Sequence, residues 1–343
     1  MNSNELNARI KSGALSGWYI LAGEEDYLKK HYFNLIEKTV IQDDTFAPFN
    51  LTVFDGQDVD FSAVAEAIEA PPFMSEYKLI AWKYANLDAL KESEKSALSE
   101  LFALKDDHKS SIFVIMTTLD GFDTGTPKKP SKLYSRLAEG FDIISFEKAS
   151  DSQLLSWLKK HFDAEEISVD RPSLEALIFR SGRSMQTLAG EVEKLSAYLK
   201  ANGISALSTP IVEKIAAATV ECDAFTLSNA VLEKNIEKAF LALSDFKMRR
   251  IDPSAVIAML EYTYTDLASV AMLLDEGRSA ADIESIMKFH PFKTKLYISS
   301  AKKVGAKRLT ESLAELRRID AASKSGGISG FGAVEIFITK NFN

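Results

Sequence analysis

The sequence predicts an α/β plus all-α protein, with a parallel-sheet domain at its N-terminal side and helical domains after it. Up to about residue 148, short apolar runs alternate with helical patterns, and beyond that point the strand pattern disappears. Alternating strands and helices are typical of a parallel sheet covered by helices on both faces. The 343 residues, 46% of them hydrophobic, are enough for two or three domains with separate cores.

Five apolar runs in the first part are predicted strands: WYILA at 18–22, FNLTVF at 49–54, KLIAW at 78–82, SIFVIMT at 111–117 and DIISF at 142–146. Most are short and bounded by turn residues, as strands buried on both faces tend to be. The helical patterns between them cover 27–41, 60–69, 87–104 and 129–139. Two glycines and two prolines mark 120–132 as a loop.

The rest of the chain is predicted to be helical. One amphipathic core stripe consists of Leu188, Val192, Leu195 and Leu199, which recur at helical spacing. Asp151 lies where an N-cap is expected for the helix that follows. Because the polar stretch at 201–210 separates two groups of helical patterns, the chain divides into an α/β part, a small helical part and a larger helical part.

The first strand and helix are placed where a nucleotide-binding α/β domain holds its phosphate loop. That loop needs G-x-x-x-x-G-K-[ST], but here Gly23 is followed by Glu24, Glu25 and Asp26. Three carboxylates suit the N-terminus of a helix and would repel a triphosphate. The third strand ends in Lys83–Tyr84 and lacks the acidic pair that would hold a metal-bound water. We therefore expect neither a cofactor nor ATP hydrolysis.

Other catalytic patterns are missing from the sequence as well. The four histidines are scattered, with no H-x-x-x-H pair for a metal, and there is no G-x-S-x-G elbow. Cys222 is the single cysteine, so an internal disulfide and a cysteine-based zinc cluster are both excluded. A buried or incidental thiol is its default interpretation. The sequence thus predicts no catalytic residue and no metal site.

The charge is unevenly distributed. The net charge is −8, yet residues 286–325 hold ten Lys/Arg against three Asp/Glu. A basic segment on an acidic protein indicates an anionic partner met at one place, or simply a solvated helical face, which the sequence alone slightly favours. No apolar run approaches the ~18 residues of a membrane helix, and the polar N-terminus lacks a secretory pattern. We expect a soluble cytoplasmic protein with no membrane contact.

Several stretches together resemble one family. They are YILAGEEDYL (19–28), FDG (54–56), PPFMSEYKLI (71–80), EVEKLSAYL (191–199), FTLSNAV (225–231), HPF (290–292) and the pair Asp320 and Lys324. In this order and spacing the chain resembles the delta subunits of the bacterial DNA polymerase III clamp loader. The resemblance extends over nearly the whole chain.

The resemblance implies an AAA+-like fold with three domains. They are a RecA-like domain without a functional phosphate loop at 1–148, a helical lid at 149–218 and a helical collar for oligomerisation at 219–343. It also implies a subunit that does not hydrolyse ATP, within the DNA-directed DNA polymerase III holoenzyme, a nucleotidyltransferase. The implied partners are the beta sliding clamp, the tau/gamma and delta-prime subunits joined through the collar, and primer–template DNA.

In this family the loop after the second helix of the first domain inserts an apolar pair into the sliding clamp. Pro72 and Phe73 match that pair, with Pro72 where many members have leucine, and Met74 is a further candidate. Pro71 and Pro72 stop the preceding helix and direct the chain away from it. The alternative is that Phe73 and Met74 fold back under their own helix as satellite core.

Four basic residues are candidate contacts for DNA or a partner subunit. Lys303 and Lys307 are four apart and predicted to lie on one helical face, beside Lys302 and Arg308. Such a face could contact primer–template phosphates or an acidic neighbour in the collar. Two other functions stay open: a degenerate AAA+ ATPase that still turns over nucleotide, and a delta-prime-like or other inactive AAA+ adaptor. The missing zinc cysteines and the PPFMSE loop count against delta-prime.

Overall fold

The computed structural model describes residues 1–43, 45–56, 59–126, 128–328 and 330–342. These form two compact units, Met1–Ser150 and Asp151–Asn343. The expected division of the second unit into a lid and a collar near residue 218 stays a prediction.

The first unit contains a five-stranded parallel sheet in the order β2-β3-β4-β1-β7. Its strands are β1 (Trp18–Ala22), β2 (Leu51–Asp55), β3 (Lys78–Ala85), β4 (Ser111–Thr117) and β7 (Asp142–Ser145). All five overlap the predicted strands, because each is an apolar run that the sheet buries wholly or in part. The parallel sheet of the predicted fold class is therefore confirmed.

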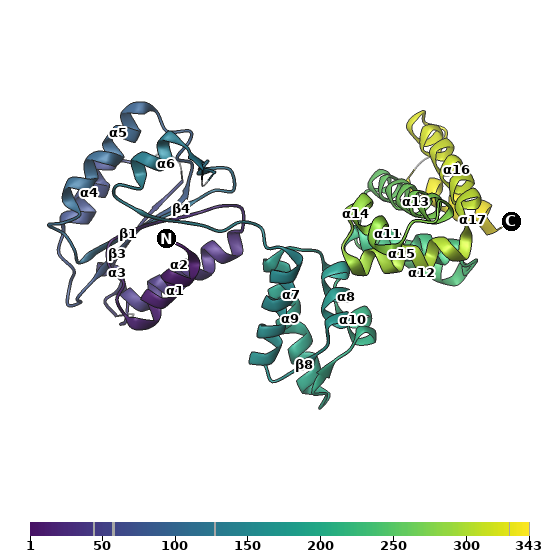
Figure 1. Ribbon diagram of the computed structural model, residues 1–343, viewed down its shortest axis with the longest axis horizontal. Coiled ribbons are helices and arrows are strands. Elements are labelled where there is room, and N and C mark those ends of the chain that lie inside the picture. Colours follow the sequence, from purple (N-terminus) through teal and green to yellow (C-terminus); the bar gives the residue numbers. More distant parts are fainter. Residues whose placement is uncertain (44, 57–58, 127, 329, 343) are drawn as a thin grey trace. The chain divides into compact units, whose positions relative to one another are not determined.

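Helices cover both faces of this sheet, which gives three layers (Figure 1). On one face α1 (Ser3–Ser12) and α2 (Asp26–Val40) pack on the side chains of Tyr19 and Leu21. On the other face, which carries Trp18 and Ile20, the layer consists of α4 (Phe61–Glu69), α5 (Glu92–Glu100), the 3-10 turn η1 (Leu101–Leu104) and α6 (Lys132–Leu137). Successive strand residues thus enter opposite cores.

Two local predictions need correction, and one helix was not predicted. The run 49–54 is not a strand from its first residue, because Ala47–Asn50 forms the helical turn α3 and β2 begins at Leu51. Pro48 lies in the first turn of α3, where its fixed φ favours a helix. The loop at 120–132 contains a small antiparallel hairpin of β5 (Gly125–Thr126) and β6 (Lys129–Pro130), and residue 127 lies outside the described residues. Helix α1 was not predicted from the polar N-terminus.

Over residues 151–328 and 330–342, the second unit is helical apart from one short parallel pair, β8 (Ser168–Val169) with β9 (Ala206–Leu207). The predicted core stripe on α9 is confirmed, since its four leucine and valine side chains are buried. The helices are α7 (Asp151–Ala164), α8 (Arg171–Ser181), α9 (Met185–Ala201), α10 (Thr209–Ile215), α11 (Val220–Leu232), α12 (Ile236–Met248), α13 (Pro253–Asp275), α14 (Ala280–Met287), α15 (Pro291–Val304), α16 (Ala306–Lys324) and α17 (Gly332–Phe342).

Helix α13 is the centre of the larger helical core. Val256, Leu260, Tyr264 and Leu267 on it are buried among side chains from α11, α12, α15, α16 and α17. By length and composition α13 could cross a membrane, as could α10 and α11 if that pair, bent by 107°, is counted as one span among the described residues. However, 56% of the apolar stretch of α13 is buried inside the protein, as in the core helix of a soluble protein.

The free thiol of Cys222 is buried on α11, and this burial raises its pKa to about 11. Because the thiolate is the nucleophile, a pKa two units above the ordinary 9.0 lowers its population at pH 8 by about 100-fold. We therefore expect iodoacetamide to alkylate the folded protein at least about 100-fold more slowly than the urea-unfolded chain. Mass spectrometry of quenched time points measures both rates, and equal rates would contradict the buried thiol.

Candidate functional site

The carboxyl edge of the sheet is where an α/β domain binds phosphates, and here the protein fills that position with its own backbone. The loop after β1 lies against the segment after β7: Glu25 N–H donates to the Phe146 carbonyl at 2.8 Å, and Phe146 N–H donates to the Ala22 carbonyl at 2.8 Å. Gly23 allows this close approach, because a Cβ atom there would lie 2.5 Å from the Phe146 carbonyl oxygen. The Glu25 N–H, which could otherwise face a phosphate, is thus already bonded to the Phe146 carbonyl.

Lys29 occupies the lysine position of the phosphate-loop pattern when that pattern is counted from Gly23, whereas Leu28 and Lys30 replace the second glycine and the hydroxyl residue. Its side chain is 1% exposed, and its ammonium donates to the Thr117 carbonyl at 2.8 Å and pairs with Asp26 at 2.8 Å. The ammonium that would bind phosphate in a working loop therefore joins α2 to the end of β4. Lys29 was not predicted from the sequence to have a role at this position.

The carboxylates of this loop are also engaged in contacts within the unit. Glu24 pairs with Lys148 at 3.0 Å, and burial raises the pKa of Glu25. At the end of β3 the Lys83 ammonium lies 4.6 Å from the centre of the Phe33 ring, where a metal-dependent ATPase would have acidic residues. Among the described residues no group of three or more His, Cys, Asp and Glu side chains could hold a metal ion.

The opposite, amino edge of the sheet carries the loop between α4 and β3, which holds the predicted contact residues. Phe73 is 48% exposed and Met74 is 77% exposed, while Pro72 is partly buried. The alternative in which the phenylalanine and methionine fold back as satellite core is therefore wrong. Met74 has φ 51°, a left-handed conformation that is uncommon for a residue with a side chain.

Asn50, at the end of α3, holds the backbone of this loop. Its Oδ1 accepts a hydrogen bond from Phe73 N–H at 2.8 Å, and its Nδ2 donates to the Phe73 carbonyl at 2.8 Å. The same Nδ2 donates to the Phe46 carbonyl at 3.3 Å. The side chain is buried, so these bonds are shielded from water. Asn50 thus joins two segments that are 23 residues apart through both backbone groups of one residue, Phe73.

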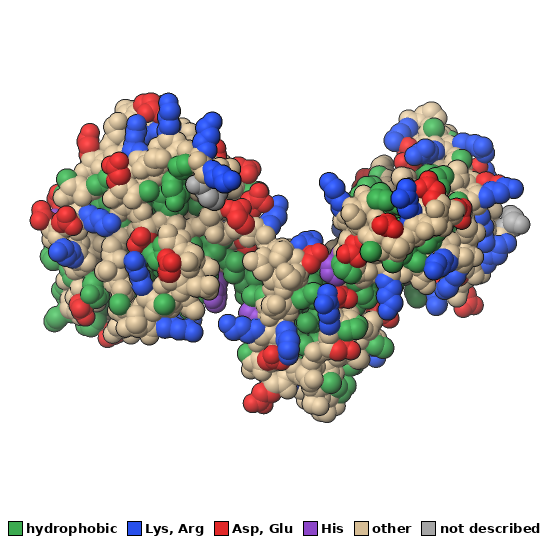
Figure 2. Space-filling model, viewed as in Figure 1, with side chains coloured by type: hydrophobic (Ala, Val, Ile, Leu, Met, Phe, Trp, Pro, Cys, Tyr) green, Lys and Arg blue, Asp and Glu red, His purple; other side chains and the backbone are tan. Residues whose placement is uncertain are grey.

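Three aromatic rings form a group at this edge, which we call the aromatic cluster: Phe46, Phe49 and Phe73. The Phe73 ring lies 5.0 Å from that of Phe49 and 5.9 Å from that of Phe46, measured between ring centres. Phe49 is 64% exposed. In Figure 2 hydrophobic side chains gather at the lower left of the first unit, in the region where Figure 1 labels α3. Phe46 and Phe49 were not predicted as site residues, although the segment FAPFN at 46–50 contains both.

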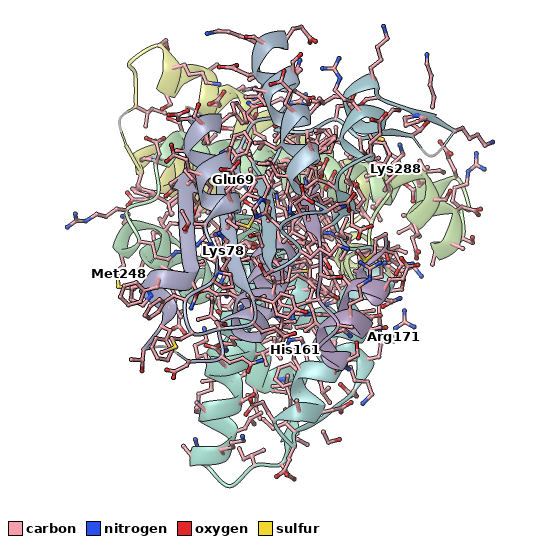
Figure 3. The ribbon with its side chains drawn as sticks, turned by 90° about the vertical axis from the view of Figure 1, so that its left-hand side faces the viewer. Glu69, Lys78, His161, Arg171, Met248 and Lys288 are labelled. Atoms are coloured by element: carbon pink, nitrogen blue, oxygen red, sulfur yellow. The ribbon has the colours of Figure 1, made fainter. Side chains whose placement is uncertain are left out.

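Lys78, labelled in Figure 3, fixes the start of β3 directly after the loop. Its buried ammonium donates to the carbonyls of Ala67 and Ala70, which end α4 without partners inside the helix. Burial lowers the pKa of this ammonium. The Ser111 hydroxyl adds a bond to the Ile68 carbonyl at 2.7 Å. Both ends of the loop are therefore anchored to the sheet, and its middle is held by α3.

The four basic candidates in the second unit do not share one helical face, which corrects the prediction. Lys303 lies in the last turn of α15 and Lys307 in the first turn of α16, because Gly305 ends α15 with φ 84°. Lys303 pairs with Glu233 at 3.2 Å. Lys302 and Lys307 are exposed, whereas Arg308 is half-buried. Two further basic residues of the segment 286–325 pair within their own helix, Lys324 with Asp320 at 2.5 Å and Arg318 with Glu315 at 3.0 Å.

The fold and the two edges of the sheet define a class of protein: a three-layer parallel α/β unit, followed by a helical unit, in which the protein's own side chains and backbone close the position where such domains bind phosphates. Two family models identify it more closely. One, described as "DNA polymerase III, delta subunit", matches residues 19–132, and the other, described as "DNA polymerase III delta subunit, C-terminal domain", matches residues 221–341. Together they match more than half of the chain, which belongs to the DNA polymerase III delta subunit family.

Individual relatives agree with this family. The chain is 21% identical to DNA polymerase III subunit delta of Bacillus subtilis, over 96% of this chain and 94% of that protein. It is 23% identical to a probable DNA polymerase III subunit delta of Aquifex aeolicus, over 89% of this chain and 85% of that protein. The solved structure of the Bacillus subtilis DNA clamp loader delta protein has the same fold, with a TM-score of 0.59 and 20% identity over 99% of both chains.

The contact of Lys29 predicts a stability role for the lysine of the phosphate-loop position. We expect Lys29→Met to lower the free energy of unfolding by about 1–3 kcal/mol, because the buried Thr117 carbonyl loses its partner. The exposed neighbour Lys30→Met is the matched control, with an expected change within about 0.5 kcal/mol. Urea unfolding measures both values.

A fluorescent ATP analogue with Mg²⁺ tests the closed nucleotide position directly. We expect no saturable binding to the wild type at micromolar protein. Saturable binding by the wild type that is lost in Lys29→Met would contradict a structural role for this lysine and favour the degenerate ATPase.

Proposed function

We propose that this chain is a non-ATPase clamp loader subunit that binds the bacterial beta sliding clamp through Pro72, Phe73 and Met74. The observation that carries the proposal is the exposure of Phe73 and Met74. Their loop is held in its middle by Asn50 and at its end by Lys78. Large apolar side chains exposed together mark binding surfaces in soluble proteins. Membership of the delta subunit family supports the clamp as the partner.

The magnitude of apolar burial limits what this loop can do alone. Fully burying Phe73 and Met74 contributes ~1.5–3 kcal/mol each, and Phe73 is already half covered in the free protein. A nanomolar complex needs about 12 kcal/mol. The loop is therefore a hot spot within a wider interface that includes further surface of the first unit.

Opening the ring needs more than tight binding. A protein shifts the clamp toward an open form only by the difference between its affinities for the open and closed rings. In our proposal the first unit binds a clamp with one interface opened and uses no ATP itself. ATP binding by the tau/gamma subunits controls when the loop is exposed, and the helices of the second unit join the chain to those subunits and to delta-prime. The assembly works in the cytoplasm on primed DNA.

The loop can be tested by a double substitution. We expect Phe73→Ala with Met74→Ser to reduce affinity for a purified bacterial sliding clamp by at least about 100-fold, because two anchors are truncated. Met74 is largely exposed and Phe73 is half exposed, so the midpoint of urea unfolding should fall only slightly below that of the wild type. Surface plasmon resonance on an immobilised clamp measures the affinity.

Leu119→Ser is the matched control for this test, since Leu119 is also 48% exposed and lies in the same unit. We expect it to bind the clamp as the wild type does. Undiminished binding by the double variant would contradict the proposed loop. Binding of nucleotide without binding of the clamp would favour a degenerate ATPase, and assembly into a clamp loader without clamp binding would favour a delta-prime-like adaptor.

A second contact is proposed for the exposed lysines of the second unit. Lys302 and Lys307 flank the break at Gly305, and both are exposed. We include Arg308 as a weaker candidate because it is half-buried, and Lys303 because its pair with Glu233 is exposed and therefore weak. Their partner in this proposal is the backbone of primer–template DNA, and an acidic surface of a collar neighbour is the alternative.

Salt dependence distinguishes phosphate contacts from other effects. We expect Lys302→Glu with Lys307→Glu to weaken binding of primer–template DNA by the assembled clamp loader and to reduce the slope of log K against log salt by roughly 2. Lys160→Glu, an exposed charge reversal on α7, is the control. Fluorescence anisotropy at four salt concentrations gives the slopes. An unchanged slope would contradict the proposed DNA contact. Failure of the variant to assemble into a clamp loader would favour an acidic surface of a collar neighbour as the partner.

A further inference from the structure

We propose that α3 supplies a second part of the clamp contact: Phe49 binds the sliding clamp beside Phe73, and Asn50 is a positioning residue that holds Phe73 in its binding conformation before the clamp arrives. This inference rests on the proposed function. It adds a segment that lies 23 residues before the loop and that the PPFMSE pattern does not include.

The geometry of Asn50 fits a positioning role. Its amide satisfies both polar groups of Phe73, the N–H through Oδ1 and the carbonyl through Nδ2, each at 2.8 Å. A single side chain that bonds both backbone groups of one residue fixes the position and the orientation of that residue's backbone. Because Asn50 is buried and also donates to the Phe46 carbonyl, its own conformation is fixed by α3. The Phe73 backbone is therefore ordered without any partner.

Order in the free loop matters for binding. A flexible loop loses conformational entropy when it docks, and this loss is subtracted from the affinity. Asn50 and Lys78 remove much of that loss in advance, since they fix the middle and the end of the same loop. Met74 is then presented directly after Phe73, with its φ of 51° set by the anchored neighbours.

Phe49 lies beside Phe73 and is also exposed. The two ring centres are 5.0 Å apart, with an angle of 44° between the ring planes. A surface that covers the exposed half of Phe73 therefore comes within van der Waals reach of Phe49. Phe46 is the half-buried base of the aromatic cluster, and Phe49 is its most exposed ring at 64%. The sliding clamp is the occupant because this surface is continuous with the proposed contact of Phe73 and Met74.

Clamp-binding kinetics of the full-length chain separate the two roles. With the purified sliding clamp immobilised, we expect Phe49→Ala to raise the dissociation rate constant by at least about 10-fold, because the complex loses a ring that the clamp covers. We expect Asn50→Ala to lower the association rate constant by about 10-fold, because the free loop then samples other conformations. Leu119→Ser, Phe73→Ala and the wild type are measured beside them.

Two further readouts show whether Asn50 acts through Phe73. Hydrogen exchange of the Phe73 amide should speed up by at least about 10-fold in Asn50→Ala, while exchange in β1 and β4 stays unchanged. In the Phe73→Ala background, Asn50→Ala should weaken clamp binding no further, because the positioned ring is already missing. Asn50→Asp keeps the acceptor for Phe73 N–H but loses the donor, so its effect should be intermediate. This variant also tests the proposal if Asn50→Ala unfolds.

The outcomes distinguish this inference from the proposed function. A wild type that does not bind the clamp overturns both. If the wild type binds and Phe73→Ala does not, wild-type kinetics for Phe49→Ala overturn the role of Phe49 and leave the proposed function standing. Additive effects of Asn50→Ala and Phe73→Ala, or unchanged exchange of the Phe73 amide in Asn50→Ala and Asn50→Asp, overturn the positioning role.

Discussion

The first unit depends on one physical constraint: an ammonium group removed from water must find oxygen acceptors nearby. Lys29 and Lys78 are both buried, and both donate to backbone carbonyls that would otherwise lack partners, at Thr117 for the first and at Ala67 and Ala70 for the second. Each lysine joins a helix to the sheet. Removing either side chain leaves buried carbonyls without partners. The Lys29 contact therefore holds the first turn of α2 against the end of β4, and the Lys78 contact holds the end of α4 against the start of β3.

These two lysines lie at opposite edges of the parallel sheet, and the edges have different roles. At the carboxyl edge, where nucleotides bind in related architectures, Lys29, Glu25 and Phe146 close the position with internal bonds. At the amino edge, Lys78 anchors a loop that leaves the sheet and exposes Phe73 and Met74. The internal bonds of the carboxyl edge therefore do not involve the residues that are exposed at the amino edge.

The sequence predicts most of the architecture because the sheet strands are apolar runs and the helices between them are amphipathic, and both patterns are local. It also predicts which loop exposes Phe73. It does not predict that Asn50 holds this residue, since a buried side chain bonded across 23 residues leaves no periodic pattern. The assignment of Phe49 to a strand is wrong because Pro48 starts a helical turn within an apolar run. Lys303 and Lys307 have helical spacing, but Gly305 between them ends one helix and begins the next.

The conformation of Met74 adds a second reason, after the exposure of Phe73 and Met74, to regard the loop as a functional surface. A left-handed backbone costs a residue with a side chain roughly 1–2 kcal/mol, and a glycine at this position would remove that cost. Such strain persists only where the surrounding structure imposes it. Here Asn50 fixes the preceding residue and Lys78 fixes the start of β3, so the chain between them has few conformations available. The result is that a large apolar side chain is directed into solvent, which is unfavourable for the isolated unit and favourable once a partner covers it.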